Sequence, residues 1–211
     1  ILQEFYKGVG ARRRMYEENP VVALVRLVAR NRRRYGGYIV HAGIVILFAA
    51  FGGMAFRAEH DVTLADGESY TTRDPYGREW TFTSEGLSTF KGMNREVVAS
   101  SRRPVMEGKA LPVLTSEKRQ HVDSRGNPTF QPSTEVGILY SARQDVYLVL
   151  AGVVGERAEL RINFNPIVMW VWAGGLLMAI GGLIVMWPQS ERRRQSGYVA
   201  ELAPGVEVGA A

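Results

Sequence analysis

Two long apolar stretches with a polar segment between them dominate the pattern of the chain. Residues 35–56 and 166–187 are each 22 residues long and contain no Lys, Arg, Asp or Glu. At about 1.5 Å of rise per residue, a helix of this length crosses the roughly 30 Å hydrocarbon layer of a bilayer. The pattern therefore predicts two transmembrane helices. A cleavable signal peptide does not fit the first stretch, because a charged leader of 34 residues precedes it and no small-residue cleavage site follows.

The starts of two helices are marked by an Asn-Pro pair. Asn165-Pro166 has the pattern of an N-cap with proline at the first helical position, so we expect the second apolar helix to start at Pro166. Asn19-Pro20 predicts a further helix within the leader, residues 1–34. Beyond Pro20, apolar residues recur at helical spacing on one face and arginines lie on another: Val21, Leu24, Val25 and Val28 against Arg26, Arg30 and Arg33. We interpret this segment as an amphipathic helix lying on a membrane surface.

The junction between this amphipathic helix and the first apolar stretch allows two interpretations. The two segments can form one long helix, or they can be separate helices. Gly36-Gly37 favours a break between them, because glycine is a poor helix former.

Strand-like alternation characterises the segment between the apolar stretches, residues 57–165. Apolar and polar residues alternate around Trp80-Thr81-Phe82 and again over residues 136–140 and 160–164, and Val146–Leu150 is a short continuous run of β-prone residues. Turn signals such as Asp74-Pro75-Tyr76-Gly77 separate these runs. The pattern predicts six to eight short antiparallel strands that form a small barrel or sandwich. The predicted fold is thus membrane α + β, with two transmembrane helices flanking an antiparallel β-domain.

The distribution of charge predicts the orientation in the membrane. The leader holds nine Lys and Arg against three acids, whereas residues 57–165 hold fourteen basic and fifteen acidic residues, and Arg192–Arg194 follow the second stretch in the tail, residues 188–211. Basic residues close to helix ends stay in the cytoplasm. We therefore expect both termini to be cytoplasmic and the β-domain to be extracytoplasmic. Nucleic-acid binding by the arginine clusters is the competing interpretation, and their position beside membrane helices argues against it.

The composition leaves few residues for catalysis or metal binding. The chain has no cysteine, which excludes disulfides, thiol nucleophiles and cysteine metal sites. Its three histidines are His41, His60 and His121. His60 and His121 lie in polar surroundings typical of surface residues. With no nucleophile–base grouping, phosphate-binding loop or metal-spaced cluster present, nothing indicates a self-contained enzyme.

His41 is the candidate site residue, because it is the only His, Lys, Arg, Asp or Glu in either apolar stretch. It lies six residues beyond Tyr35, or ~9 Å along a helix. Ionisable residues at such depth face a bundle interior, a cavity or a ligand. Haem or metal ligation, a proton path and an interhelical hydrogen bond all remain open. Gly37, Val45, Phe48 and Gly52 share its helix face, and the glycines suit either a flat macrocycle or close helix packing.

Several motifs resemble the CcmF family of cytochrome c-type biogenesis (haem lyase) membrane proteins. These are residues 31–43 (NRRRYGGYIVHAG), residues 114–121 (LTSEKRQH) with the strands that follow, and residues 165–175 (NPIVMWVWAGG). The resemblance covers about residues 31–187 and implies the C-terminal part of such a protein. The Trp-Trp-Asp signature of the family is missing, so a preceding N-terminal part is expected as a partner.

The resemblance implies a function in haem attachment. Members of the family hold a haem b between two intramembrane histidines, receive haem from the chaperone CcmE and attach it to apocytochrome c with CcmH-type partners. His41 matches one of the two axial ligands of the haem iron. The resemblance therefore implies a haem lyase module of a bacterial inner membrane with a periplasmic β-domain, at most part of an enzyme, although an organelle membrane fits as well. The rival hypothesis is a non-catalytic β-domain, anchored in the membrane, that docks or scaffolds a complex.

Overall fold

The computed structural model describes residues 1–188 of the chain. The chain divides into two compact units, one made of residues 1–43 and the segment from Leu176 onward, the other of residues 44–175. Apart from Pro188, the predicted tail of residues 188–211, including Arg192–Arg194, lies outside the described residues.

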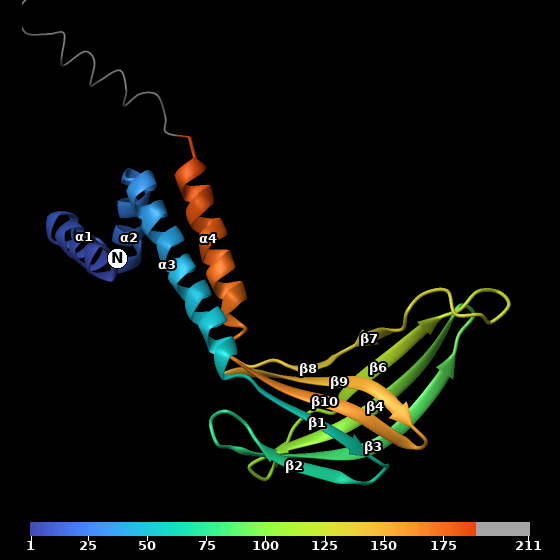
Figure 1. Ribbon diagram of the computed structural model, residues 1–211. Coiled ribbons are helices and arrows are strands. Elements are labelled where there is room, and N and C mark those ends of the chain that lie inside the picture. Colours follow the sequence, from blue (N-terminus) through green and yellow to red (C-terminus); the bar gives the residue numbers. More distant parts are fainter. Residues whose placement is uncertain (189–211) are drawn as a thin grey trace, which may run out of the picture. The chain divides into compact units, whose positions relative to one another are not determined.

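The helices of the chain are α1 (Leu2–Tyr16), α2 (Pro20–Arg30), α3 (Arg32–Gly53) with a short 3₁₀ turn η1 (Met54–Phe56), and α4 (Trp170–Met186) (Figure 1). The Asn19 side chain caps α2 by accepting a hydrogen bond from the Val21 backbone N–H at 3.0 Å, with Pro20 at the first helical position. This confirms the predicted helix start. Helix α1 was not predicted, because glycines and Arg12–Arg14 interrupt its apolar residues and leave no continuous apolar face.

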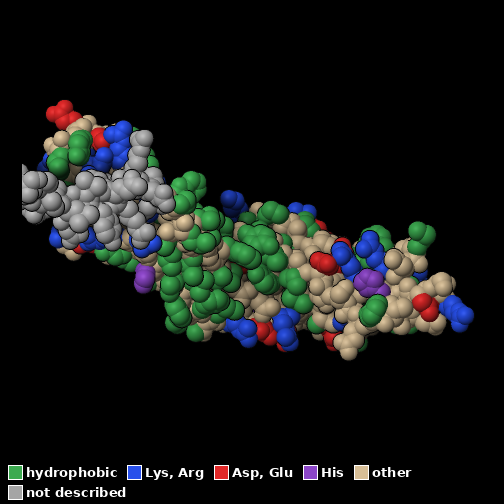
Figure 2. Space-filling model, turned by 90° about the horizontal axis from the view of Figure 1, so that it is seen from above, with side chains coloured by type: hydrophobic (Ala, Val, Ile, Leu, Met, Phe, Trp, Pro, Cys, Tyr) green, Lys and Arg blue, Asp and Glu red, His purple; other side chains and the backbone are tan. Residues whose placement is uncertain are grey.

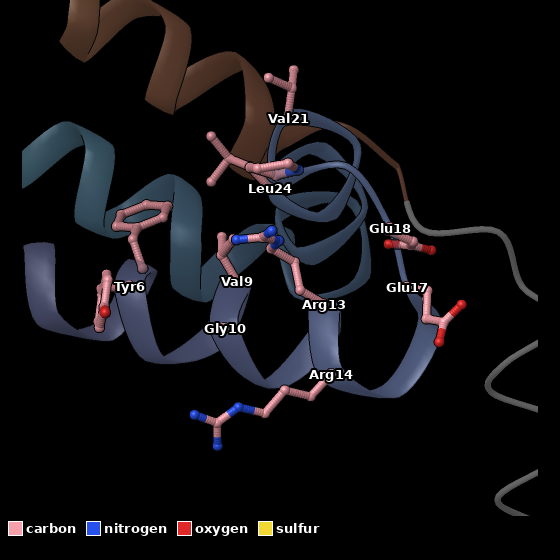
Figure 3. A pocket seen from close by; sticks show the side chains of 11 residues that line it. Tyr6, Val9, Gly10, Arg13, Arg14, Glu17, Glu18, Val21 and Leu24 are labelled. Carbon is pink, nitrogen blue, oxygen red and sulfur yellow. The ribbon is translucent and has the colours of Figure 1, made fainter.

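Contacts with α2 and α3 hold α1 in place. Glu18 accepts hydrogen bonds from Arg12 of α1 at 2.8 Å and from Arg26 of α2 at 2.5 Å. Figure 3 shows the recess between α1 and α2, where Val9 and Arg13 of α1 lie toward Leu24 of α2 and Arg14 points away. At the other end of α1, the Phe5 ring lies 5.1 Å from the Tyr35 ring of α3. The leader is thus a pair of helices rather than one.

The break between α2 and α3 lies at Asn31, not at the predicted Gly36-Gly37. Both glycines lie inside α3, and Gly36 has a packing role. A Cβ on Gly36 would lie 2.7 Å from a methyl group of Val185 and 3.0 Å from the Gly181 carbonyl oxygen. A Cβ on Gly181 would lie 2.8 Å from the Gly36 carbonyl oxygen. Small residues at this crossing therefore allow the backbones of α3 and α4 to touch.

The second apolar helix starts later than expected. Asn165 and Pro166 belong to strand β10 and pair with Asp145 and Gln144 of β9, so their backbone is committed to the sheet. The chain then turns through Ile167, whose φ is 48°, and α4 begins at Trp170. With 17 residues, α4 is about 26 Å long. Within residues 1–188, one helix, the continuous segment Arg32–Phe56, is long and apolar enough to cross a membrane, and α4 is a shorter apolar helix.

Two antiparallel sheets form the β-domain, which confirms the predicted β-rich antiparallel fold (Figure 1). The four-stranded sheet has the order β1 (Ala58–Leu64), β10 (Arg157–Pro166), β9 (Gln144–Val154) and β8 (Gly137–Leu139). The six-stranded sheet has the order β2 (Ser69–Arg73), β3 (Glu79–Lys91), β4 (Arg95–Met106), β6 (Leu114–His121) and β7 (Ser133–Glu135), with β5 (Lys109–Ala110) paired to β4. Residues 1–188 form ten strands where six to eight were predicted: β8 falls within the alternation of residues 136–140, whereas β5, with two residues, is too short to show a period.

The two sheets share one hydrophobic core. Phe164 of β10 packs on Trp80 and Phe82 of β3, with ring centroids 5.5 and 6.3 Å apart, and all three side chains are buried. Leu148 and Leu150 of β9 complete the same cluster. Trp80, Phe82 and Phe164 lie in the alternating segments of the sequence, and Leu148 and Leu150 lie in its continuous β-prone run.

Asp74 ties the two sheets together at the turn between β2 and β3. Its buried Oδ2 accepts hydrogen bonds from Trp80 Nε1 at 3.0 Å, Gln144 Nε2 at 2.8 Å and Arg78 Nε at 2.8 Å. Its Oδ1 accepts from the backbone N–H groups of Tyr76 and Arg78. Burial by itself raises the pKa of Asp74, but these hydrogen bonds together lower its pKa below the ordinary value.

We expect Asp74→Asn to destabilise the β-domain by about 3 kcal/mol, because an amide cannot accept from three donors at the Oδ2 position. Asp123→Asn is the matched control: Asp123 accepts from Arg125 and Asn127 in an equivalent but exposed turn. Because the pKa of Asp74 is lowered, its contribution is complete at neutral pH and is lost as the pH falls through the folded-state pKa. Urea unfolding at several pH values measures both effects, and equal losses for the two variants would contradict the assignment.

We expect Gly181→Ala to weaken the packing of α3 on α4 by about 1–3 kcal/mol, because the added methyl group meets backbone atoms that cannot move aside. Gly182→Ala is the control, since a Cβ there meets nothing within 4 Å. Unfolding free energies in mixed detergent micelles compare the two variants. An equal effect of both would show that the backbone contact is not needed.

Candidate functional site

His41 lies in the middle of α3, and its side chain is exposed rather than packed in the helical unit. Its Nδ1 is 2.8 Å from the Gly37 carbonyl oxygen one turn earlier. A carbonyl oxygen only accepts, so in this contact Nδ1 carries the proton and donates. The neutral ring then presents the lone pair of Nε2 outward. Histidines that bind metal ions commonly have their other nitrogen held by a backbone carbonyl in this way.

The face of α3 that carries His41 is open. A Cβ on Gly37 or on Gly52 would meet no atom within 4 Å. Val45 and Phe48, which follow His41 at helical spacing, expose 64% and 69% of their surface. Exposed apolar side chains also occur along α4, and Figure 2 shows hydrophobic side chains gathered into one broad patch. The His41 face thus offers an apolar wall with one nitrogen ligand and room for a flat group.

Helix α4 packs on a different face of α3. Val40, the residue before His41, and Gly36, the residue before Gly37, are the α3 residues that meet Gly181. Successive residues in a helix are 100° apart, so the α4 contact leaves the His41 face free. Among the described residues, His41 therefore makes no interhelical hydrogen bond, and its one polar partner is within α3.

Side chains at the start of α3 fix how the helix begins. Tyr35 and Tyr38 lie edge to face, with ring centroids 5.9 Å apart, and Phe5 of α1 contacts both. Arg34 donates from Nε to the Tyr38 hydroxyl at 3.2 Å and forms an ion pair with Glu4 of α1. This cluster anchors the first turns of α3, around Gly37 and just before His41.

The other two histidines have ordinary environments within the β-domain. In β1, the His60 ring contacts Phe164 and Tyr70, and its Nε2 lies 3.1 Å from the Thr72 hydroxyl. His121 is exposed at the end of β6. Within residues 1–188 no group of three or more His, Asp or Glu side chains is placed to hold a metal ion.

One buried charged residue has no signal in the sequence. Arg102 of β4 is fully buried between the sheets. It stands beside Arg103, and two adjacent arginines in a strand give no sign of which side chain faces inward. The structure alone separates them, because Arg103 forms an exposed ion pair with Glu85.

No model of a known protein family matches the chain, but individual known proteins are similar to it. The chain is 34% identical over 177 residues to the cytochrome c-type biogenesis protein CcmF of Pseudomonas fluorescens, which covers 81% of the chain and 25% of that protein. It is 28% identical to CcmF of Escherichia coli over 77% of the chain and 24% of that protein. The chain thus spans about a quarter of the length of these relatives.

A solved structure has a similar fold. The chain aligns with the cytochrome c haem lyase CcmF at a TM-score of 0.58 and 22% identity, over 89% of the chain and 34% of that structure. At this identity the likeness concerns the fold, and it extends over the helices and the β-domain.

Proposed function

Because the chain is homologous to part of the CcmF-type cytochrome c-type biogenesis proteins, we propose that it is a module of a cytochrome c haem lyase whose His41 supplies one axial ligand to a haem b. The single observation that carries the proposal is the hydrogen bond from His41 Nδ1 to the Gly37 carbonyl oxygen. It leaves Nε2 as the free nitrogen of an exposed ring on an otherwise apolar helix face.

The surroundings of His41 fit a flat, largely apolar group. Gly37 and Gly52 leave space on either side along the helix, and Phe48 offers an aromatic surface two turns after His41. No other ligand atom lies on this face, because Val45 is aliphatic. The second axial ligand therefore comes from a different element or from another chain. When bound, the haem supplies a one-electron redox centre, while the Gly37 carbonyl oxygen of this chain orients the imidazole.

The proposed partners follow from the same relationship. We assign the apocytochrome, the haem chaperone CcmE, a CcmH-type protein and the remainder of a CcmF-like protein as partners of the complete complex. The chain offers no nucleophile of its own for attaching haem, since it has no cysteine. Covalent attachment thus needs thiols from the apocytochrome, and this chain acts as one component of the lyase.

We propose that α3 and α4 both cross the inner membrane and that the β-domain is periplasmic. The leader carries nine basic residues against three acids, while residues 57–165 carry a net charge of −1, from fourteen basic and fifteen acidic residues. The shorter α4 is extended by Trp187 at one end, and the indole of Trp170 donates to the Ala142 carbonyl oxygen at the other. Aromatic residues at both ends are typical of a helix that spans a bilayer.

Cysteine labelling from the periplasmic side tests this orientation, and the chain has no native cysteine to interfere. Ser124 is exposed in a loop of the β-domain, so the cysteine of Ser124→Cys is expected to react with the labelling reagent. Met15→Cys, in an exposed position of α1, is the cytoplasmic control and is expected to react only after the membrane is opened. The reverse pattern would exclude the proposed topology.

His41→Ala in the complete complex is expected to abolish most of the haem b absorption and the maturation of cytochrome c. No side chain on the same face can replace the nitrogen, whereas alanine suits the helix and should leave insertion intact. Added imidazole is expected to restore part of the absorption by occupying the vacated space. The visible spectrum of the purified complex measures the effect.

Phe51→Ala is the control for this experiment. Phe51 is an exposed apolar residue of α3 that lies about 80° around the helix from His41, so its loss should leave the spectrum unchanged. If His41 only bonds a neighbouring helix, the substitution should cost about 1–2 kcal/mol of packing and the haem spectrum should survive. That outcome would reject the ligand assignment and favour the docking or scaffold role.

A further inference from the structure

A groove with apolar walls lies among α2, α3 and α4, within the helical unit of the chain. Its volume is about 570 Å³. Each helix contributes aliphatic side chains, among them Val25 and Val28 of α2, Ile39 of α3 and Ile184 of α4. Arg32 is the one Lys, Arg, Asp or Glu that lines the groove among residues 1–188. The groove therefore suits a long apolar group that carries a negative charge at one end.

The groove extends along the helices from a polar end to an aliphatic end. Ile39 comes seven residues after Arg32 in α3, and Ile180 comes seven residues before Trp187, so each helix lines about 10 Å of the groove. Trp187 directly follows α4 and exposes 64% of its surface. Arginine and tryptophan beside aliphatic residues mark the interface between the headgroups and the interior of a bilayer. The groove thus lies at the depth of a lipid headgroup and the first part of its acyl chains.

The guanidinium of Arg32 has donors available at the polar end. Its Nη1 donates to the Pro188 carbonyl oxygen at 3.0 Å, which ties the start of α3 to the residues that follow α4. Nε and Nη2 bond to no acceptor among the described residues, and the side chain is partly exposed. These two atoms form one edge of the planar guanidinium, and such an edge binds two oxygens of a phosphate. Arg32 can therefore keep its bond to Pro188 and bind a phosphate at the same time.

The charge around Arg32 is positive. Arg30 and Arg33 are exposed beside it and form no ion pair within residues 1–188. Residues 19–58 contain no Asp or Glu, and the acids of the leader that approach this segment are already paired with other arginines. An apolar helix of a partner protein could fill the groove but would leave this charge without a counterion. An anionic phospholipid supplies both the apolar chain and the negative charge.

We propose that the groove binds one anionic phospholipid of the cytoplasmic leaflet, with its phosphate on the Nε–Nη2 edge of Arg32. One acyl chain lies along Val28 and Ile184, and the charges of Arg30 and Arg33 attract the headgroup. Basic pockets between membrane helices on the cytoplasmic side typically bind such headgroups. The choice of leaflet rests on the topology proposed above, and the site is independent of the haem assignment.

Native mass spectrometry of the complete complex in detergent tests the proposal. Phosphatidylglycerol and phosphatidylcholine with the same acyl chains are titrated separately, and the lipids bound to each complex are counted. One phosphatidylglycerol is expected to bind at about tenfold lower concentration than phosphatidylcholine, because only its headgroup has a net negative charge to match the arginines. Millimolar inorganic phosphate is expected to leave this lipid bound, since phosphate lacks the acyl chain.

Two pairs of variants locate the bound lipid. Arg32→Gln is expected to weaken phosphatidylglycerol binding about tenfold, because it removes the two-point phosphate contact. Its control is Arg14→Gln, since Arg14 lies outside the groove and points away from α2 (Figure 3). Ala29→Trp fills the groove and is expected to prevent binding of the lipid. Its control is Ala179→Trp, which alters an exposed alanine of α4 outside the groove. The Ala29 pair decides the question if Arg32→Gln fails to assemble.

Four outcomes would overturn the proposal. Equal binding of the two lipids would show that the charge has no role, and equal losses in a variant and its control would show that the lipid lies elsewhere. Release of the lipid by inorganic phosphate would identify a free anion as the occupant. Loss of a protein subunit from Ala29→Trp, with an unchanged lipid count, would identify the groove as a protein interface. The haem spectrum and the cysteine labelling test the proposed function separately, because neither depends on the lipid count.

Discussion

The backbone contact between Gly36 and Gly181 determines which side of α3 is available for function. A Cβ on Gly36 would lie 3.0 Å from the Gly181 carbonyl oxygen, and a Cβ on Gly181 would lie 2.8 Å from the Gly36 carbonyl oxygen. Helix α4 therefore packs on the face of Gly36 and Val40. The face of Gly37 and His41 is 100° further around α3. Gly37 is also a glycine, but a Cβ there would meet no atom within 4 Å, so α4 uses Gly36 and not Gly37. The helix therefore has one face packed on α4 and another, with His41, that α4 leaves uncovered.

In the β-domain, both apolar and polar contacts join the two sheets. Phe164 of one sheet contacts Trp80 and Phe82 of the other through an edge-to-face and a tilted ring contact, while Asp74 joins the sheets through Trp80 Nε1 and Gln144. Five donors surround the Asp74 carboxylate and offset the effect of burial, which by itself raises its pKa. Arg102 is the opposite case in the same domain: it is a buried charge, and its Nε and Nη2 have no hydrogen-bond partner among the described residues. The two residues thus differ in how completely their buried polar atoms are paired.

Much of this fold can be predicted from the hydrophobic periodicity of the sequence. The long apolar helix, the capping of α2 by Asn19 and the inward residues of β3, β9 and β10 follow from period and capping chemistry. The start of α4 did not follow, because the ladder with β9 retains Asn165 and Pro166 in a strand despite their helix-start pattern. The break between α2 and α3 was predicted at Gly36-Gly37 but lies at Asn31, because Gly36 serves the packing of α3 on α4 and does not interrupt the helix. His41 was identifiable from its depth in an apolar stretch, but its proton position depends on Gly37, and Arg102 gave no signal beside Arg103.

The central claim concerns one nitrogen atom, Nε2 of His41. Its most direct test is a structure of the complete complex isolated with haem, at a resolution that defines the ligands of the iron. The account predicts that Nε2 of His41 is bonded to the haem iron while Nδ1 keeps its hydrogen bond to the Gly37 carbonyl oxygen. A haem held by other residues, with His41 Nε2 facing lipid or bonded to a neighbouring helix, would contradict it.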